Sequence, residues 1–168
     1  STTTDLIPLR NGWPSSQGMT DSERLASGEL VYTGARRTPL CALSDAAPYR
    51  GRNCRVAAEH FATTLDIYLT TGDHPEDPTD CDTANGRPST RDAARDRLAR
   101  MVCCDRDEFS EEDALIMARH FEACQTRRLT AAVEQTLGVF KSDVQSVVIS
   151  GSGSFLAERV ADDCRRLS

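Results

Sequence analysis

The sequence lacks several features that would assign it to a specialised class of protein. It contains no apolar run approaching the ~18 residues that suggest a membrane-spanning helix. Its net charge is −6 and its basic residues are dispersed, so it offers no basic face for duplex nucleic acid. We therefore expect neither a membrane nor a nucleic acid as a partner. The 168 residues, 39% hydrophobic and 27% charged, suit one ordinary globular domain.

The cysteines lack the spacing of a metal or redox site. Seven are present, their number is odd, and no C-x-x-C pair occurs. This pattern gives little support to a zinc ribbon or a redox motif, and cytosolic proteins rarely form disulfides. We therefore expect free thiols in a cytoplasmic protein. Residue 1 is Ser rather than Met, so we expect the natural start of the protein to lie outside this sequence.

Hydrophobic spacing and turn residues predict an alternation of strands and helices. Thr20 with Glu23 forms a helix-start pattern, and Gly28 is a stop signal. The order of elements is an α/β pattern, and small-residue turns at strand ends are where such folds collect ligands. We expect strands at 6–9, 29–33 and 147–149, helices at 20–28, 55–71, 90–102, 110–137 and 155–166, and a long loop at 73–89.

Two segments of small residues are candidates for phosphate binding. The first is Ser1, Thr2, Thr3 and Thr4, whose hydroxyls and unshielded backbone N–H groups suit phosphate oxygens. The alternative is a surface loop of threonines. The second follows the predicted strand 147–149 and precedes a helix, where glycines let a ligand approach the backbone; the alternative is a plain strand-to-helix turn. Its residues are Gly151, Ser152, Gly153 and Ser154.

A basic turn and an acidic loop are candidates for binding a diphosphate. Arg36 and Arg37 follow a strand and a glycine, and arginine binds phosphate oxygens in bidentate fashion. The acidic loop could hold a Mg²⁺ ion that bridges the diphosphate. The alternatives are a solvated basic turn and a solvated acidic loop. The predicted substrate residues here are Gly34, Arg36, Arg37, Thr38 and Arg87, and the predicted metal ligands are Asp77 and Asp82.

Two carboxylates are candidate general bases. Glu59 and Asp66 lie seven residues apart in the helix predicted at 55–71, so we expect them on one helical face. One of them could accept a proton from an incoming amine. The alternative is that both are solvated carboxylates on a helix surface.

Several of these segments resemble a known superfold. Residues 1–5 resemble the end of the second phosphate loop, D-I-G-S-T-T-T-D, of the actin, Hsp70 and sugar-kinase superfold, and residues 146–154 resemble its adenosine-side motif. Residues 29–43 and 57–87 resemble a narrower group, the hydantoinase/oxoprolinase-like proteins of the tetrahydromethanopterin-linked C1-transfer pathway. Their archaeal relatives are methanofuran-pathway synthases, which join an aminomethylfuran diphosphate to γ-glutamyltyramine.

The resemblance implies an α/β fold, a ribonuclease H-like lobe of this superfold, truncated at both ends. The Asp-Ile-Gly that should precede Ser1 is absent. Residues 1–168 would form the second, C-terminal lobe, with a largely helical insert at about 53–138. Because the ligand of this superfold lies between two lobes, a first lobe would supply half of the active site.

The resemblance also implies an enzyme in its full-length form. The expected reaction is a transfer that releases diphosphate in methanofuran biosynthesis, with a small-molecule diphosphate or nucleotide and an amine as partners. Two alternatives stay open: an ATP-dependent hydantoinase/oxoprolinase-type hydrolase or small-molecule kinase, and a non-catalytic binding lobe. Mg²⁺ is an expected cofactor, whereas ATP and a homodimer are left open.

Overall fold

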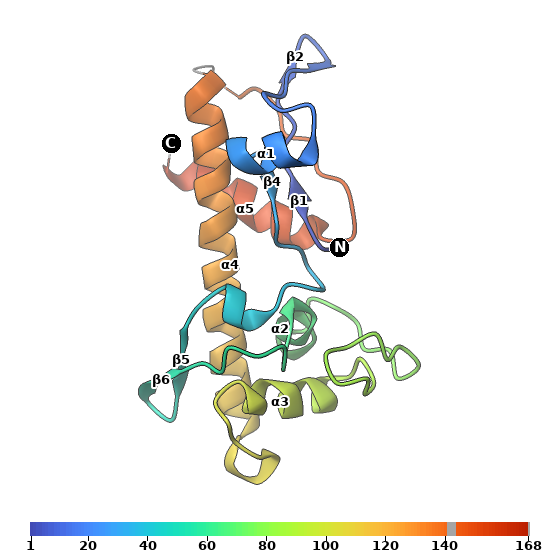
Figure 1. Cartoon of the computed structure of the whole chain (residues 1–168), viewed down its shortest axis with the longest axis vertical. Helices are drawn as coiled ribbons and strands as arrows, with labels where there is room; N and C mark the ends of the chain where they lie inside the picture. The colour runs from blue at the N-terminus through green and yellow to red at the C-terminus, as the bar shows by residue number, and fades with distance from the viewer. Residues whose placement is uncertain (141–143, 168) are drawn as a thin grey trace. The chain divides into compact units, whose positions relative to one another are not determined.

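The computed structural model describes residues 1–140 and 144–167. These residues form two compact units (Figure 1). The first unit contains Ser1–Gly34 and Thr126–Ser168, and the second contains Ala35–Gln125. One long helix, α4 (Glu111–Phe140), contributes its first part to the second unit and its last part to the first.

The strands of the first unit form two small antiparallel pairs. Strand β1 (Thr4–Asp5) pairs with β4 (Leu30–Val31), and β2 (Leu9–Arg10) pairs with β3 (Trp13–Pro14). The turn between β2 and β3 is Asn11-Gly12, with φ angles of 53° and 81°. Both values lie in the left-handed region that the favoured two-residue hairpin turn requires, which explains the Asn-Gly pair.

Two helices accompany these strands in the first unit. Helix α1 (Asp21–Ser27) begins at Thr20 and ends at Gly28, whose φ is 83°. The buried Glu29 carboxylate accepts hydrogen bonds from the backbone N–H groups of Gln17 and Gly18. Its burial is therefore compensated by donors. Helix α5 (Ser154–Leu167) buries Leu156 and Val160.

The second unit is mainly helical. Helix α2 (Thr64–Thr71) packs against α3 (Arg91–Arg100), and Leu65, Leu69 and Ala94 form a buried cluster between them. Buried residues of α4 in this unit are Met117, Ala118 and Phe121. A hairpin of β5 (Ala46–Tyr49) and β6 (Arg52–Arg55) and the short 3₁₀ helices η1 (Leu40–Ala42) and η2 (Arg106–Glu108) complete the unit.

Four predicted helices are confirmed: α1, α3, α4 and α5 follow the expected ranges within a few residues. The helix predicted at 55–71 is wrong in its first half: Arg55 pairs with β5, residues 56–63 are not helical, and the helix begins only at Thr64. Its start is fixed by a capping box of Thr63 and Asp66, in which each side chain accepts a hydrogen bond from the other residue's backbone N–H.

The strands are shorter than predicted. The expected strand at 29–33 is present as β4, whereas 6–9 contributes only Leu9 to β2. The strand predicted at 147–149 is not formed: residues 144–150 have no regular structure, and Val148 is 83% exposed. A strand needs a neighbour to satisfy its backbone groups. The mixed α/β character is confirmed, and in the described residues its sheets are two-stranded and antiparallel.

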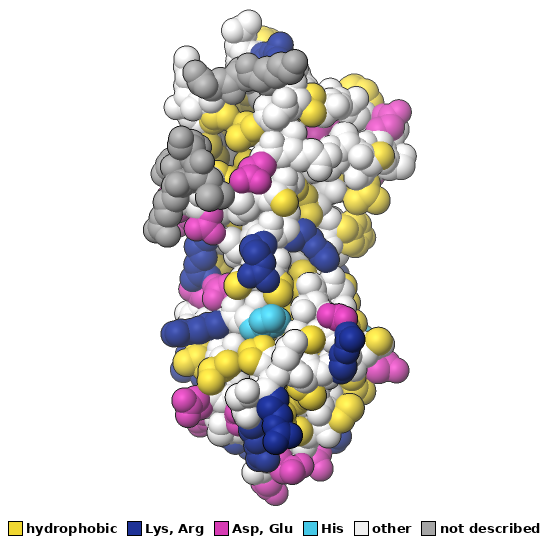
Figure 2. Space-filling view, turned by 90° about the vertical axis from the view of Figure 1, so that its left-hand side faces the viewer, with side chains coloured by type: hydrophobic (Ala, Val, Ile, Leu, Met, Phe, Trp, Pro, Cys, Tyr) yellow, Lys and Arg dark blue, Asp and Glu magenta, His cyan; other side chains and the backbone are white. Residues whose placement is uncertain are grey.

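The surface mixes charges of both signs. On the face drawn in Figure 2, dark blue Lys and Arg side chains are interspersed with magenta Asp and Glu side chains. Among the described residues, every helix is too short or too polar to cross a bilayer.

Candidate functional site

The predicted basic turn and acidic loop come together in the second unit. Arg36 forms an ion pair with Asp80, and its Nη2 also donates to the Asp82 backbone oxygen at 3.3 Å. The Nη2 of Arg37 donates to the Asp82 carboxylate at 2.8 Å. We call these four side chains, Arg36, Arg37, Asp80 and Asp82, the Arg–Asp cluster. The cluster is close to neutral, because two guanidinium groups face two carboxylates.

The ion pairs change the acidity of both carboxylates. The hydrogen bond from Arg36 lowers the pKa of Asp80, and the hydrogen bond from Arg37 lowers the pKa of Asp82. The same contact raises the pKa of Arg37. Both aspartates therefore stay ionised at neutral pH, and they orient the two arginines at the end of the turn.

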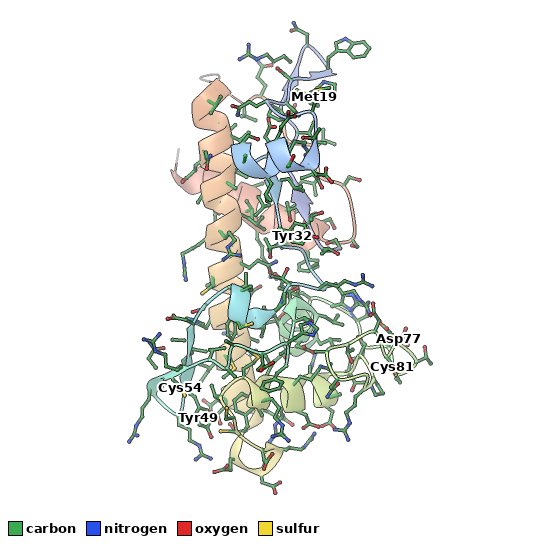
Figure 3. All side chains as sticks on the ribbon, viewed as in Figure 1. Met19, Tyr32, Tyr49, Cys54, Asp77 and Cys81 are labelled. Atoms are coloured by element: carbon green, nitrogen blue, oxygen red, sulfur yellow. The ribbon has the colours of Figure 1, made fainter. Side chains whose placement is uncertain are left out.

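The expected magnesium ligands do not fit a metal ion. Asp77 lies on the loop after α2 (Figure 3), and its Oδ1 accepts hydrogen bonds from the Thr79 N–H and hydroxyl. The carboxylate of Asp82 is engaged by Arg37. Across residues 1–140 and 144–167, no group of three or more metal-ligating side chains occurs. Magnesium needs several oxygen ligands that are free to coordinate it, which Asp77 and Asp82 do not supply in this arrangement.

The other predicted substrate residues of this unit have structural neighbours. Arg87 forms an ion pair of 3.1 Å with Asp96 and is exposed. Thr38 is buried; its backbone oxygen accepts from the Thr64 N–H at 2.9 Å, and its N–H donates to the Thr64 hydroxyl at 3.4 Å, at the start of α2. Thr38 therefore joins the turn to the helix.

The first phosphate segment lies beside Gly34 in the first unit. The Thr4 hydroxyl donates to the Thr33 backbone oxygen at 2.8 Å. A Cβ atom at Gly34 would lie 2.8 Å from the Ser1 backbone, so a larger residue would push the two segments apart. Ser1 is exposed and Thr2, Thr3 and Thr4 are half-buried.

The second phosphate segment forms the turn into α5. The Ser154 N–H donates to the Gly151 oxygen at 3.3 Å, and Gly151 has a φ of 108° that favours glycine. Gly151 and Ser152 are exposed, whereas Gly153 and Ser154 are half-buried. The turn thus presents backbone groups to solvent at the start of a helix.

The two candidate bases do not share a helical face. Glu59 lies before α2, in a segment without helical structure, and it is exposed. Asp66 is buried, and its carboxylate accepts hydrogen bonds from Arg97 Nε at 2.7 Å and from the Thr63 N–H at 2.9 Å. Burial raises the pKa of Asp66, and the Arg97 guanidinium and the Thr63 N–H oppose that rise. Both carboxylate oxygens of Asp66 therefore contact protein groups inside the core, and its catalytic role stays a prediction.

Sequence reasoning missed Arg97, which pairs with Asp66 in the core. Asp80, which completes the Arg–Asp cluster, was part of the predicted acidic loop but was not singled out as a site residue. Arg97 shares the buried face of α3 with Ala93, Ala94 and Leu98. The spacing of these residues could have identified Arg97, since it places a charged residue on an apolar helical face, where such a residue needs a buried partner.

A comparison with protein families matches residues 1–165 to the model described as hydantoinase/oxoprolinase. The chain belongs to the hydantoinase/oxoprolinase family. The resemblance noted from residues 29–43 and 57–87 is thereby confirmed.

Two relatives of this chain carry the same name, "(4-{4-[2-(gamma-L-glutamylamino)ethyl]phenoxymethyl}furan-2-yl)methanamine synthase". The relative from Methanococcus vannielii is 32% identical over 91% of this chain and 68% of its own length. The relative from Methanocaldococcus jannaschii is 28% identical over 100% of this chain and 50% of its own length. The chain thus spans about half to two thirds of these relatives. Both are named as synthases, which confirms the expectation of an enzyme family.

Proposed function

We propose that the full-length protein is a transferase-type synthase of methanofuran biosynthesis, which joins an aminomethylfuran diphosphate to a tyramine-like co-substrate. The observation that carries this proposal is the similarity over 91% of the chain to a relative named for such a product. The proposal assigns this chain to the second lobe of an actin-like superfold, with the insert at about 53–138. It also keeps the cytoplasm as its location.

The name of the relatives refines the chemistry that we expected. A phenoxymethylfuran is an aryl ether, in which a phenol oxygen is bonded to the carbon attached to the furan ring. We therefore propose the phenol oxygen, rather than the amine, as the nucleophile. The new C–O bond forms as the bond from that carbon to the diphosphate breaks, the diphosphate leaves with the electron pair, and the phenol proton passes to a base.

The Arg–Asp cluster is the proposed site for the leaving group. Arg37 is exposed, so a diphosphate could replace Asp82 on its guanidinium while Asp80 keeps Arg36 in place. Such an exchange of one anion for another needs little reorganisation, and charge-assisted hydrogen bonds would stabilise the departing diphosphate. Arg87, on the same loop as Asp80 and Asp82, belongs to the same proposal.

Glu59 is the candidate base in this proposal. It is exposed, and it lies outside the regular elements of the second unit. A carboxylate can accept the phenol proton in the transition state if it lies within hydrogen-bonding reach. The hydroxyls and N–H groups of residues 1–4 and 151–154 remain candidates for phosphate oxygens of a substrate or a nucleotide.

The test uses the full-length protein with an aminomethylfuran diphosphate and γ-glutamyltyramine, and mass spectrometry of the product. We expect the aryl ether and free diphosphate without any ATP. Arg36→Ala and Arg37→Ala should each weaken binding of the diphosphate substrate about ten- to a hundredfold with little change in Tm. Arg52→Ala, an exposed arginine of β6, is the control. Product formation that is unchanged in both cluster variants would remove the cluster from the site.

An ATP-dependent hydrolase is the second candidate, because the matching family is described as hydantoinase/oxoprolinase. Such an enzyme would couple opening of a cyclic amide to ATP hydrolysis. The same preparation distinguishes the two: release of phosphate from ATP on addition of a hydantoin or oxoproline, without ether formation, would favour the hydrolase.

A further inference from the structure

A pocket of about 420 Å³ lies in the second unit, outside the Arg–Asp cluster. Phe61, one of its lining residues, is 38% exposed. Its lining combines cationic, amide and aromatic groups: His60, Phe61, Ala84, Asn85, Arg97 and Arg100. Of these residues, Arg97 is fully buried, at 0% side-chain exposure.

The buried guanidinium of Arg97 has an incomplete set of hydrogen bonds. Its Nε donates to Asp66 at 2.7 Å, and its Nη1 donates to Asn85 Oδ1 at 3.2 Å and to the Pro88 oxygen at 3.4 Å. Its Nη2 has no acceptor within the described part of the chain. Buried polar groups are normally hydrogen-bonded, so this atom indicates a missing acceptor at the pocket.

Asn85, which lines the pocket, can add a second donor. Its Oδ1 accepts from Arg97 Nη1 and, also at 3.2 Å, from the Arg87 N–H. An asparagine side chain has one accepting oxygen and one donating NH₂ group. With the oxygen committed to these donors, Nδ2 is left to donate to another acceptor.

The charge balance indicates what that acceptor is. Asp66 already offsets the charge of Arg97, and Asp105 lies 3.4 Å from Arg100 at the exposed rim. These two ion pairs leave the lining close to neutral, so the pocket accommodates a monoanion at lower electrostatic cost than a doubly charged phosphate. The planar fork of arginine fits a carboxylate, and Phe61 offers an apolar surface to a ring.

We propose that this pocket binds the carboxylate of a small ring-containing molecule, with Arg97 Nη2, Asn85 Nδ2 and Arg100 as its donors. Because Nη2 is buried, the ligand reaches it after an exposed rim side chain turns aside. The Phe61 and Arg100 side chains are both exposed enough to do so. This site does not depend on the proposed synthase reaction.

The test is calorimetric titration of the full-length protein with phenylacetate, compared with the uncharged phenylacetamide and with inorganic phosphate. We expect saturable binding of phenylacetate, and binding at least about tenfold weaker for phenylacetamide and for phosphate. NMR shifts at Asn85 and Phe61 should accompany saturation. Absence of phenylacetate binding, or equal binding of the amide, would overturn the carboxylate site, and tighter binding of phosphate would replace it with a phosphate site.

Two variants locate the binding without removing Arg97, whose loss would break the buried ion pair. Arg100→Ala and Asn85→Ala should each weaken phenylacetate binding about three- to tenfold. Arg52→Ala removes an exposed arginine of β6 that does not line the pocket and should leave binding unchanged. If Arg52→Ala weakens binding as much as Arg100→Ala, the ligand senses only overall charge and the pocket assignment is wrong.

Discussion

Asp66 and Arg97 show how a pair of charges is tolerated in the core of the second unit. Both side chains are buried, and their contact at 2.7 Å joins α2 to α3. Each charge would be costly without the other, because desolvation of an unpaired ion exceeds any compensation available in an apolar interior. The same carboxylate also caps α2 through the Thr63 N–H, so one side chain supports two features of the unit.

We predict that Asp66→Ala destabilises the protein by about 3–5 kcal/mol, because it leaves the Arg97 charge buried and unpaired. Urea unfolding followed by circular dichroism measures this free energy. Glu59→Ala removes an exposed carboxylate nearby in sequence and should change stability by less than about 0.5 kcal/mol. Adding Arg97→Met to the Asp66→Ala variant should recover part of the loss. A wild-type midpoint for Asp66→Ala would show that the pair is not formed in solution.

The Arg–Asp cluster predicts a specific pH response. Since Arg37 holds the pKa of Asp82 below its ordinary value of 3.8, the ionised pair stabilises the fold above that pH, and its contribution is lost as the pH falls through the lowered pKa. Arg37→Gln should raise the pKa of Asp82 toward 3.8. Carbon NMR titration of the aspartate carboxyls between about pH 2 and 6 measures the shift. An unchanged Asp82 titration in this variant would contradict the pairing.

The sequence predicted some of these residues and missed others for a physical reason. Arg36, Arg37 and Asp82 were visible as charged runs, and the structure brings them together. The ion pairs between them were not predictable, because the turn and the loop are far apart in the sequence: 44 positions separate Arg36 from Asp80. The composition of a loop shows how much charge it carries, whereas tertiary contacts decide which residues those charges pair with.

Helix α1 illustrates how local signals fix an element. The Thr20 hydroxyl accepts from the Glu23 N–H at 3.3 Å, and Glu23 Oε2 accepts from the Thr20 N–H at 3.0 Å. These contacts satisfy donors that a helix start leaves without partners. The contacts with the Met19 and Thr20 N–H groups lower the pKa of Glu23.

We predict that Thr20→Ala destabilises the first unit by about 1 kcal/mol, because the N-cap acceptor is lost. Thr20→Ser keeps a hydroxyl acceptor and should cost much less, which makes it the matched control. Thermal unfolding of both variants measures the difference. Equal melting temperatures for the two variants would mean that the capping box adds nothing to stability.

Elements with local signals were predictable, and elements that need distant partners were not. Helix α1 has an N-cap residue, a capping box and a C-terminal glycine within nine residues, and its expected range was right. The apolar run 147–149 has the composition of a buried strand, yet residues 144–150 have no pairing in the described chain. The first half of the helix expected at 55–71 failed because its backbone has distant partners: Arg55 pairs with β5, the Val56 N–H donates to the Asp45 oxygen, and the Ala57 N–H donates to the Met101 oxygen.

At the level of the molecule, the division into two units predicts uneven protection of the backbone. In the second unit, α2 and α3 bury Leu65, Leu69 and Leu98, so opening their hydrogen bonds exposes the core. Residues 144–150 are largely exposed and lie outside any helix or strand. Amides that open only with the whole fold exchange far more slowly than amides that are already open to solvent.

We therefore predict that the amides of Leu69 and Leu98 exchange with deuterium at least ~1000-fold more slowly than those of Val147 and Val148. Hydrogen exchange read by NMR on the 168-residue chain provides the measurement. The amides of α1 serve as an internal reference, since they are helical and belong to the first unit. Slow exchange at Val147 and Val148 would mean that this segment has backbone partners in solution, as the apolar pattern had predicted, and would favour the lobe of an actin-like superfold. Fast exchange at Leu69 or Leu98 would instead show that the helical core of the second unit is not stably folded in this chain.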